Sequence, residues 1–318
     1  GIESCNSLLL LHSFWRAVHG IKILDPTCGS GAFLFQALNV LEVLYESCLD
    51  QMERILEDHG ESKSSTNITI LKELQRVLDS TKDHPNRRYF ALKSIMLNNL
   101  FGVDIMEEAV EICKLRMFLK LAARVEADVS KPNLGLEPLP DIDFNIRPGN
   151  TLVGFTDLNQ VKTTLTSGQL KLGFEKILAE IEGKAKQCDA GFRTFRELQT
   201  NRKQDDKVLL TAKKELTDRL SRLDLELDQY LSLDYGINAT NTRAFENWRQ
   251  ECKPFHWFVG FYEIMKEGGF DMVIGNPPYI QIQKLNEFYP EETSFYQKKY
   301  LTAQDGNVDI YVPFIERS

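Results

Sequence analysis

A short apolar run that ends at an acidic residue and turns at once into a helix is the feature that most constrains the fold of this chain. Residues 21–25 read Ile-Lys-Ile-Leu-Asp, residues 26–31 form a glycine-containing turn, and from Ala32 onward apolar residues recur at helical spacing. A short apolar run before a turn predicts a buried strand, and the spacing after it predicts a helix. Strand-turn-helix units of this kind build parallel sheets covered by helices.

Three further apolar runs end in the same way, each at a polar residue. Residues 100–103 end at Asp104, residues 144–147 lead to Asn150, and residues 270–274 lead into residues 276–279. Helical segments alternate with these runs, so the sequence predicts the α/β class, as a Rossmann-like, doubly wound and mostly parallel sheet. Ligands bind beyond the carboxyl ends of the strands in such sheets. We therefore expect the polar residues to converge on one edge.

Two segments depart from the strand-helix alternation and predict helical insertions. Residues 45–95 or thereabouts are polar and mainly helical around a Ser-rich stretch at 62–66. Between residues 155 and 254, apolar residues at 216, 220, 223, 227 and 230 follow the 4-3-4-3 spacing of a coiled-coil seam. An earlier helix, with apolar residues from Leu172 to Ile181, is its expected antiparallel partner. This long hairpin is interpreted either as a structural projection or as an arm that reaches a partner or DNA.

The expected domains are therefore a catalytic core of residues 1–154 plus 255–318 and a helical insertion of residues 155–254. The absence of an initiator Met and the end just after an apolar run predict a trimmed fragment.

Composition excludes several classes of protein. The six cysteines have no C-x-x-C spacing and the five histidines do not cluster with them, so we expect no metal site and reduced thiols in a cytoplasmic protein. No apolar run approaches the roughly 18 residues that span a bilayer, so no membrane association is expected. The net charge of −8 does not suit a protein whose whole surface binds DNA. A DNA-binding surface would have to be local or lie elsewhere.

The first turn has the features of a nucleoside site. Gly29 and Gly31 let the backbone approach a ligand, Asp25 could accept hydrogen bonds from an ammonium group, and Asp104 could bind a ribose diol. The G-x-G-x-x-G fingerprint of dinucleotide sites and the phosphate loop of nucleotide triphosphate sites are both absent. A purely structural glycine turn and a helix-capping role for Asp104 remain the alternative interpretations.

Residues 276–279, Asn-Pro-Pro-Tyr, carry the second candidate site. Two prolines after a strand stiffen the chain, and the Asn276 side-chain carbonyl and the Pro277 backbone carbonyl can then converge on one amino group. An amine conjugated to a ring is a poor nucleophile, and two acceptors on its hydrogens localise its lone pair for direct attack on a methyl group. Tyr279 offers a face on which a base could stack. The alternative is a structural turn.

These motifs resemble those of a known family. Residues 24–34 are similar to the cofactor motif, and residues 268–280 to the catalytic motif, of gamma-type N6-adenine DNA methyltransferases in the type IIG restriction-modification and BREX phage-defence group. Residues 143–152, 253–258 and 306–311 also resemble that group. The resemblance implies a class I, S-adenosylmethionine-dependent methyltransferase that is site-specific for adenine in double-stranded DNA. In the gamma arrangement a recognition domain follows the core, and here it would begin after Ser318.

The resemblance also implies a role for each matching residue. Those near the methionine end of the cofactor would be Asp25, Pro26, Cys28, Gly29, Gly31 and Phe33. Asp104, with Ile105 beside it, would hold the ribose. Asn150 would lie near the cofactor adenine, although many relatives have Asp there. Asn276 and Pro277, stiffened by Pro278, would bind the target amine, and Tyr279 would stack on the flipped base.

Other functions fit the same residues. A glutamine amide poses the same chemical problem as adenine, so a protein or RNA methyltransferase is one alternative, and a catalytically silent module that binds cofactor or DNA is another. His256 and Trp257 are interpreted as core residues. No P-D…D/E-x-K nuclease site is assigned in this chain. The sequence defines neither the DNA recognition site nor the oligomeric state.

Overall fold

The computed structural model describes residues 2, 5, 7–58, 65–125, 129–130, 134, 137–167, 173–200, 206–304 and 308–317. The chain divides into two compact units. The first comprises residues 1–102, 108–147 and 271–274, and the second comprises residues 103–107, 148–270 and 275–318. This grouping by contact is not a division by function, so the expected core and insertion boundaries stay a prediction.

Four parallel strands form one sheet, which confirms the expected α/β fold. The strands are β1 (Ile23–Asp25), β2 (Leu100–Asp104), β3 (Ile146–Pro148) and β4 (Met272–Val273), in the order β3-β2-β1-β4. Leu24 lies opposite Phe101 on one side and Val273 on the other. The chain first adds β2 and β3 on one side of β1 and later adds β4 on its other side. The topological switch point therefore lies between β1 and β4.

Five helices accompany the sheet: α1 (Leu8–Gly20), α2 (Ala32–Asp58), α3 (Ser65–Lys82), α4 (Arg87–Asn98) and α5 (Glu107–Ala122). Helices α1, α2, α3 and α4 all pack against one another. Their buried faces join the strands in one hydrophobic core. The expected helices of this segment are thus confirmed as the end of α2 with α3 and α4, although most of the Ser-rich stretch lies outside the described residues. That they form an excursion from the catalytic core stays a prediction, and their buried faces belong to this hydrophobic core.

Two buried asparagines fix where strands begin. The Asn99 side chain donates to the carbonyls of Val18, His19 and Ile21 and accepts from the Tyr45 hydroxyl at 2.8 Å. Asn145, just before β3, donates to three carbonyls around the start of β2. Because a buried amide must be hydrogen-bonded, each side chain ties its strand to one arrangement of the neighbouring turns.

By length and composition alone, α2 is apolar enough to cross a membrane, although polar residues such as Gln36, Asn39 and Glu42 interrupt it. The finding is weak evidence for a membrane span, because the core helix of a globular protein passes the same test. Helix α2 packs against α1 and α4, and Glu42 on it is buried. Glu42 pairs with Lys120 of α5 at 2.7 Å.

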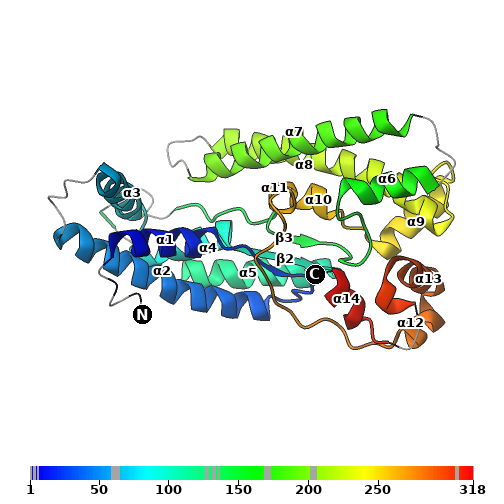
Figure 1. Cartoon of the computed structure of the whole chain (residues 1–318), viewed down its shortest axis with the longest axis horizontal. Helices are drawn as coiled ribbons and strands as arrows, with labels where there is room; N and C mark the ends of the chain where they lie inside the picture. Colours follow the sequence, from blue (N-terminus) through cyan, green and yellow to red (C-terminus); the bar gives the residue numbers. More distant parts are fainter. Residues whose placement is uncertain are drawn as a thin grey trace. The chain divides into compact units, whose positions relative to one another are not determined.

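The second unit is mainly helical. Its elements are α6 (Leu158–Ser167), α7 (Phe174–Thr200), α8 (Asp206–Leu231), η3 (Ser232–Tyr235), α9 (Thr242–Cys252), α10 (Trp257–Gly260), α11 (Tyr262–Lys266), α12 (Ile282–Phe288), α13 (Pro290–Lys299), η4 (Leu301–Ala303) and α14 (Tyr311–Arg317). Helices α7 and α8 pack side by side, which confirms the expected antiparallel hairpin (Figure 1). Leu172 lies outside the described residues.

The α8 seam is buried at Leu216, Leu220, Leu223 and Leu227, as its spacing predicts. The expected last position is wrong, because Leu231 is fully buried and Tyr230 is not. A step of four residues after Leu227 keeps the apolar stripe on one face of a 3.6-residue helix.

The expectation of a buried fourth strand from 270 to 274 is also wrong. β4 comprises only Met272 and Val273, and both side chains are exposed. Among the described strands β4 pairs only with β1 and forms the edge of the sheet. An edge strand has a neighbouring strand on one side alone, so less of the sheet surrounds its side chains.

Candidate cofactor and base-binding site

The turn after β1 is organised by the carboxylate of Asp25. This residue ends the strand and is buried, and its Oδ1 accepts the backbone N–H of Thr27 at 3.0 Å. Next, Cys28 O accepts from Gly31 N at 2.7 Å, which closes the turn into α2. The structure thus confirms the strand-turn-helix unit.

The two glycines of this turn differ in what surrounds them. Gly31 has φ +81°, and a Cβ built there would lie 2.3 Å from the Cys113 sulfur of α5. Gly29 has φ +49°, and no described atom lies within 4 Å of a Cβ built there. Gly31 therefore permits close packing between the turn and α5, whereas Gly29 leaves open space beside the backbone.

The other residues expected near the cofactor take different positions. Pro26 and Cys28 are buried, and the Cys28 sulfur packs against β2 at Gly102. Phe33, in the first turn of α2, is 46% exposed. Cys28 could therefore offer a ligand its backbone but not its side chain, whereas Phe33 has an accessible ring.

Asp104 ends β2 and also organises the start of α5. Its Oδ1 accepts the N–H of Met106 at 2.9 Å, and its backbone carbonyl accepts Gly149 N at 2.8 Å. This hydrogen bond lies in the turn before α5, which begins at Glu107, so the capping and ribose-binding roles of Asp104 both stay predictions. Ile105 is exposed beside it.

Asn150 is 5% exposed and its side chain is engaged inside the second unit. Its Nδ2 donates to Glu292 Oε1 at 2.9 Å, and its Oδ1 accepts from Leu152 N at 3.0 Å. Tyr296 also donates to Glu292. Burial, with Glu292 beside it, raises the pKa of Tyr296 well above its ordinary value, so the phenol keeps the proton that it donates. A ligand could reach the Asn150 amide only by replacing these partners.

Sequence reasoning missed the contact between Asn150 and Glu292. The two residues are 142 positions apart in the chain. The only available signal was local: Glu292 and Tyr296 have the i, i+4 spacing of one helix face, after a proline that can start a helix.

The segment from Lys253 to Trp257 pairs with the segment that begins at Asn150. Asn150 N donates to Lys253 O at 2.7 Å, and Trp257 N donates to Phe155 O at 2.9 Å. Both His256 and Trp257 are buried, which confirms their interpretation as core residues. These hydrogen bonds hold the loop after β3 in place.

His256 has a more specific role in that core than packing. Its Nδ1 accepts the backbone N–H of Phe155 at 3.2 Å, so the ring proton lies on Nε2, which donates to Asp228 at 3.0 Å. Arg249 Nε donates to the other oxygen of Asp228 at 2.6 Å. The buried aspartate is thus paired and hydrogen-bonded on both sides, as a buried charge requires.

The Asn-Pro-Pro-Tyr tetrapeptide lies on the surface of the second unit. Asn276 and Pro278 are exposed, Pro277 is half-buried, and Tyr279 is 71% exposed. The ring of Tyr279 lies against that of Tyr311, with 5.4 Å between their centroids. Among the described residues, the Asn276 amide makes no hydrogen bond, so both its oxygen and its nitrogen can bind a ligand.

The chain after Tyr279 is pinned by the segment that precedes α14. Ile310 N donates to Ile280 O at 2.8 Å, and Ile282 N donates to Val308 O at 2.9 Å. This pairing brings together two of the segments that resemble methyltransferase motifs. Residues 306 and 307 of that second segment lie outside the described residues.

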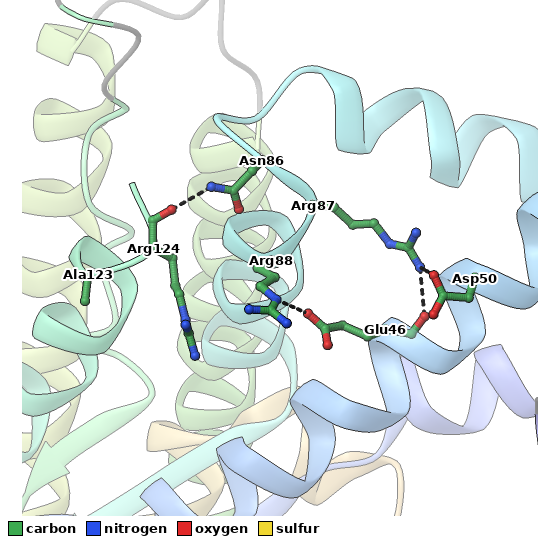
Figure 2. A pocket seen from close by; sticks show the side chains of 7 residues that line it. All are labelled: Glu46, Asp50, Asn86, Arg87, Arg88, Ala123 and Arg124. Carbon is green, nitrogen blue, oxygen red and sulfur yellow. Dashed lines mark hydrogen bonds and ion pairs between the residues drawn. The ribbon is translucent and has the colours of Figure 1, made fainter. Parts of the chain in front are cut away.

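A pocket in the first unit lies between α2, the start of α4 and the end of α5 (Figure 2). Its lining residues are Glu46, Asp50, Asn86, Arg87, Arg88, Ala123 and Arg124. Arg88 Nε donates to Glu46 at 2.8 Å, and Arg87 donates to Asp50 at 2.7 Å (Figure 2). None of the expected site residues lines it. Because its charges are largely paired with one another, we interpret it as a link between helices.

Two family models match the chain. The Eco57I restriction-modification methylase model covers residues 98–318, and the DNA-methyltransferase domain of MmeI covers residues 3–153. This chain belongs to the Eco57I restriction-modification methylase family. Matches to the two models together span both compact units.

Individual relatives carry related names. A putative type II restriction enzyme and methyltransferase of Methanocaldococcus jannaschii is 28% identical over 345 residues, covering 97% of this chain and 25% of the relative. The type II restriction enzyme and methyltransferase Eco57I of Escherichia coli is 43% identical over 49 residues, 15% of this chain and 5% of the relative. A type II methyltransferase of Pseudomonas aeruginosa is 46% identical over 52 residues, 16% of this chain and 8% of the relative. The chain thus spans at most a quarter of the relatives it matches.

Proposed function

We propose that this Eco57I-family chain is the catalytic core of an S-adenosylmethionine-dependent enzyme that methylates the N6 amine of adenine in double-stranded DNA. The observation that carries the proposal is the strand order. The switch point lies between β1 and β4, and the glycine turn and the Asn-Pro-Pro-Tyr motif directly follow these two strands. The rim beyond a switch point is where open α/β sheets bind ligands.

The residues of the first turn fit the cofactor. Open space beside Gly29 leaves room for a ligand against the backbone, and the buried Asp25 carboxylate suits the ammonium end of an amino acid. Asp104, at the end of β2, has the position that ribose-binding acids take in such sheets. Bound there, S-adenosylmethionine would supply the methyl group. The Asn150 amide, engaged with Glu292, would support the loop rather than contact the cofactor adenine directly.

The tetrapeptide residues would hold the acceptor. Asn276 Oδ1 and the Pro277 carbonyl would accept the two hydrogens of the target amine and so localise its lone pair. The prolines limit the motion of both acceptors. The exposed ring of Tyr279, supported by Tyr311, would stack on the adenine. Adenine in a duplex is out of reach of such a surface, so the base would have to be flipped out of the stack.

The expected recognition domain and the restriction-modification setting remain part of the proposal. A net charge of −8 gives this chain no general attraction for DNA phosphates. Sequence-specific contacts would therefore come from a recognition domain. Such a system would act on cellular DNA, and for a bacterial or archaeal protein this places it in the cytoplasm.

Two measurements test the proposal in turn. Calorimetric titration with S-adenosylmethionine should show saturable binding that Asp25→Ala and Asp104→Ala each weaken at least tenfold, whereas Asp79→Ala, on the exposed face of α3, should not change it. Transfer of a labelled methyl group should then be assayed on duplex DNA, on RNA and on a glutamine-containing peptide. Labelling of the RNA or the peptide but not the DNA would overturn the DNA assignment. Binding without transfer to any of them would indicate a silent module.

A further inference from the structure

An exposed aromatic pair lies at the junction of α12 and α13. Phe288, the last residue of α12, is 76% exposed, and Tyr289 after it is 55% exposed. The pair belongs to the same compact unit as residues 276–279. A single exposed apolar residue is ordinary, but two adjacent large rings at the tip of a helical hairpin form a local apolar surface.

The junction holds the two rings in a defined position. Tyr289 N donates to Leu285 O at 2.8 Å and so caps α12. The Tyr289 carbonyl accepts from both the backbone N–H and the hydroxyl of Thr293, at 3.0 and 2.9 Å. Pro290 fixes the first residue of α13. The rings therefore project from a capped helix junction rather than from a flexible loop.

The other end of this hairpin is anchored in the core of the unit. Ile282 is fully buried, and Phe295 stacks on Tyr235 with 4.7 Å between ring centroids. Tyr296 reaches the Asn150 side chain at 3.4 Å. The hairpin thus has a fixed base and an aromatic tip. An anchored base lets the tip keep its position when it contacts another molecule.

The tip is tied closely to the catalytic tetrapeptide. Ile280 and Ile282 are both paired with the segment before α14, and α12 starts at Ile282. Seven helical residues extend about 10 Å, and the three residues from Tyr279 to Ile282 add at most about 10 Å. Phe288 therefore lies within about 20 Å of Tyr279, less than the 34 Å of one turn of duplex. Both side chains could act on the same stretch of DNA.

We propose that Phe288 is a wedge that inserts into duplex DNA and fills the gap left in the base stack when the target adenine is flipped, with Tyr289 packing beside it. The inference rests on the proposed function. A flipped base leaves its former neighbours unstacked, and apolar side chains inserted between base steps compensate for this loss. Glu287 and Glu291 flank the pair, so the phosphate backbone does not attract the tip and the proposed contact is with base faces alone.

The test measures single-turnover methylation by the natural full-length protein on two duplexes. In one the target adenine is paired with thymine, and in the other it faces an abasic site, which removes the pairing that resists flipping. Phe288→Ala should slow methylation of the paired duplex by about tenfold or more and that of the abasic duplex much less. Phe288→Trp should retain the rate. Leu301→Ala is the matched control, because Leu301 is 75% exposed in the same unit and distant from the tip in sequence.

Each outcome separates the wedge from other roles. Equal slowing on both duplexes, or a fall in melting temperature that accounts for the slowing, would overturn the wedge in favour of a structural role, such as packing against another part of the protein. An unchanged rate on the paired duplex would overturn it as well. If the wild-type protein methylated adenine in neither duplex, the proposed function itself would fail. A wild-type protein that is active on both and insensitive to Phe288→Ala would refute the wedge alone.

Discussion

Replacing Gly31 by alanine tests the packing that shapes the proposed cofactor turn. Gly31 has φ +81°, and the new Cβ would lie 2.3 Å from the Cys113 sulfur and 3.2 Å from its Cβ. The left-handed conformation costs about 1–2 kcal/mol for a residue with a Cβ. Relief of the clash by movement of α5 costs about 1–3 kcal/mol more. We therefore expect Gly31→Ala to lower the free energy of unfolding by about 2–5 kcal/mol, the sum of these two costs.

Gly29→Ala and Cys113→Ala separate the two costs. Gly29 has φ +49° with no described atom within 4 Å of a new Cβ, so Gly29→Ala should lose only the conformational part, about 1–2 kcal/mol. Cys113→Ala removes the sulfur that would lie 2.3 Å from the new Cβ. The loss of unfolding free energy in the Gly31→Ala, Cys113→Ala double variant should therefore be smaller than the sum of the two single losses by about 1–3 kcal/mol.

Urea unfolding of the four variants and the wild type, with linear extrapolation, measures these differences. The reasoning would be refuted if Gly31→Ala cost no more than Gly29→Ala, or if Cys113→Ala and Gly31→Ala were additive. The same variants distinguish stability from binding. Gly29→Ala places a methyl group in the space assigned to the ligand, so it should weaken S-adenosylmethionine binding more than its small effect on stability explains.

Three further predictions concern other parts of the chain. Leu227→Ala should cost about 2–5 kcal/mol in urea unfolding because the side chain is fully buried in the hairpin seam, whereas Leu210→Ala, 65% exposed, should change stability by less than about 0.5 kcal/mol. Equal effects would contradict the assigned seam. Burial, with Lys22 nearby, lowers the pKa of His19 from 6.5, so the unfolded chain binds the proton more readily. Stability should fall as the pH drops below about 6.5, and a His19→Gln variant with the same pH dependence would refute this. Tyr296→Phe should cost about 1–3 kcal/mol by thermal or urea unfolding, because the buried Asn150 and the half-buried Glu292 each lose a hydrogen bond; a neutral result would show that the cluster adds no stability.

Local patterns were sufficient to predict the elements that build the sheet and the hairpin. The run at 21–25 and the glycine turn predicted β1 and the start of α2, because strand, turn and helix differ in spacing within a dozen residues. The heptad-like spacing likewise predicted α8 and its partner. The seam departed from the prediction only at its last position, where Leu231 rather than Tyr230 is buried.

Features that depend on distant contacts were not predicted. The exposure of β4 follows from its place at the edge of the sheet, and the apolar composition of residues 270–274 gives no indication of strand order. The engagement of Asn150 by Glu292 and the pairing of His256 with Asp228 join residues that are separated by many positions and by several elements. A single sequence specifies which residues are polar but not which of them meet.

The measurement that tests the central claim most directly is nucleoside analysis of duplex DNA after incubation with the natural full-length protein and methyl-labelled S-adenosylmethionine. The account predicts that the label appears in N6-methyladenine. It also predicts that Asn276→Ala lowers the rate by on the order of 10²–10³ while cofactor binding is kept, because one acceptor of the target amine is lost. Label in a methylated cytosine, or full activity of the Asn276→Ala variant, would contradict it.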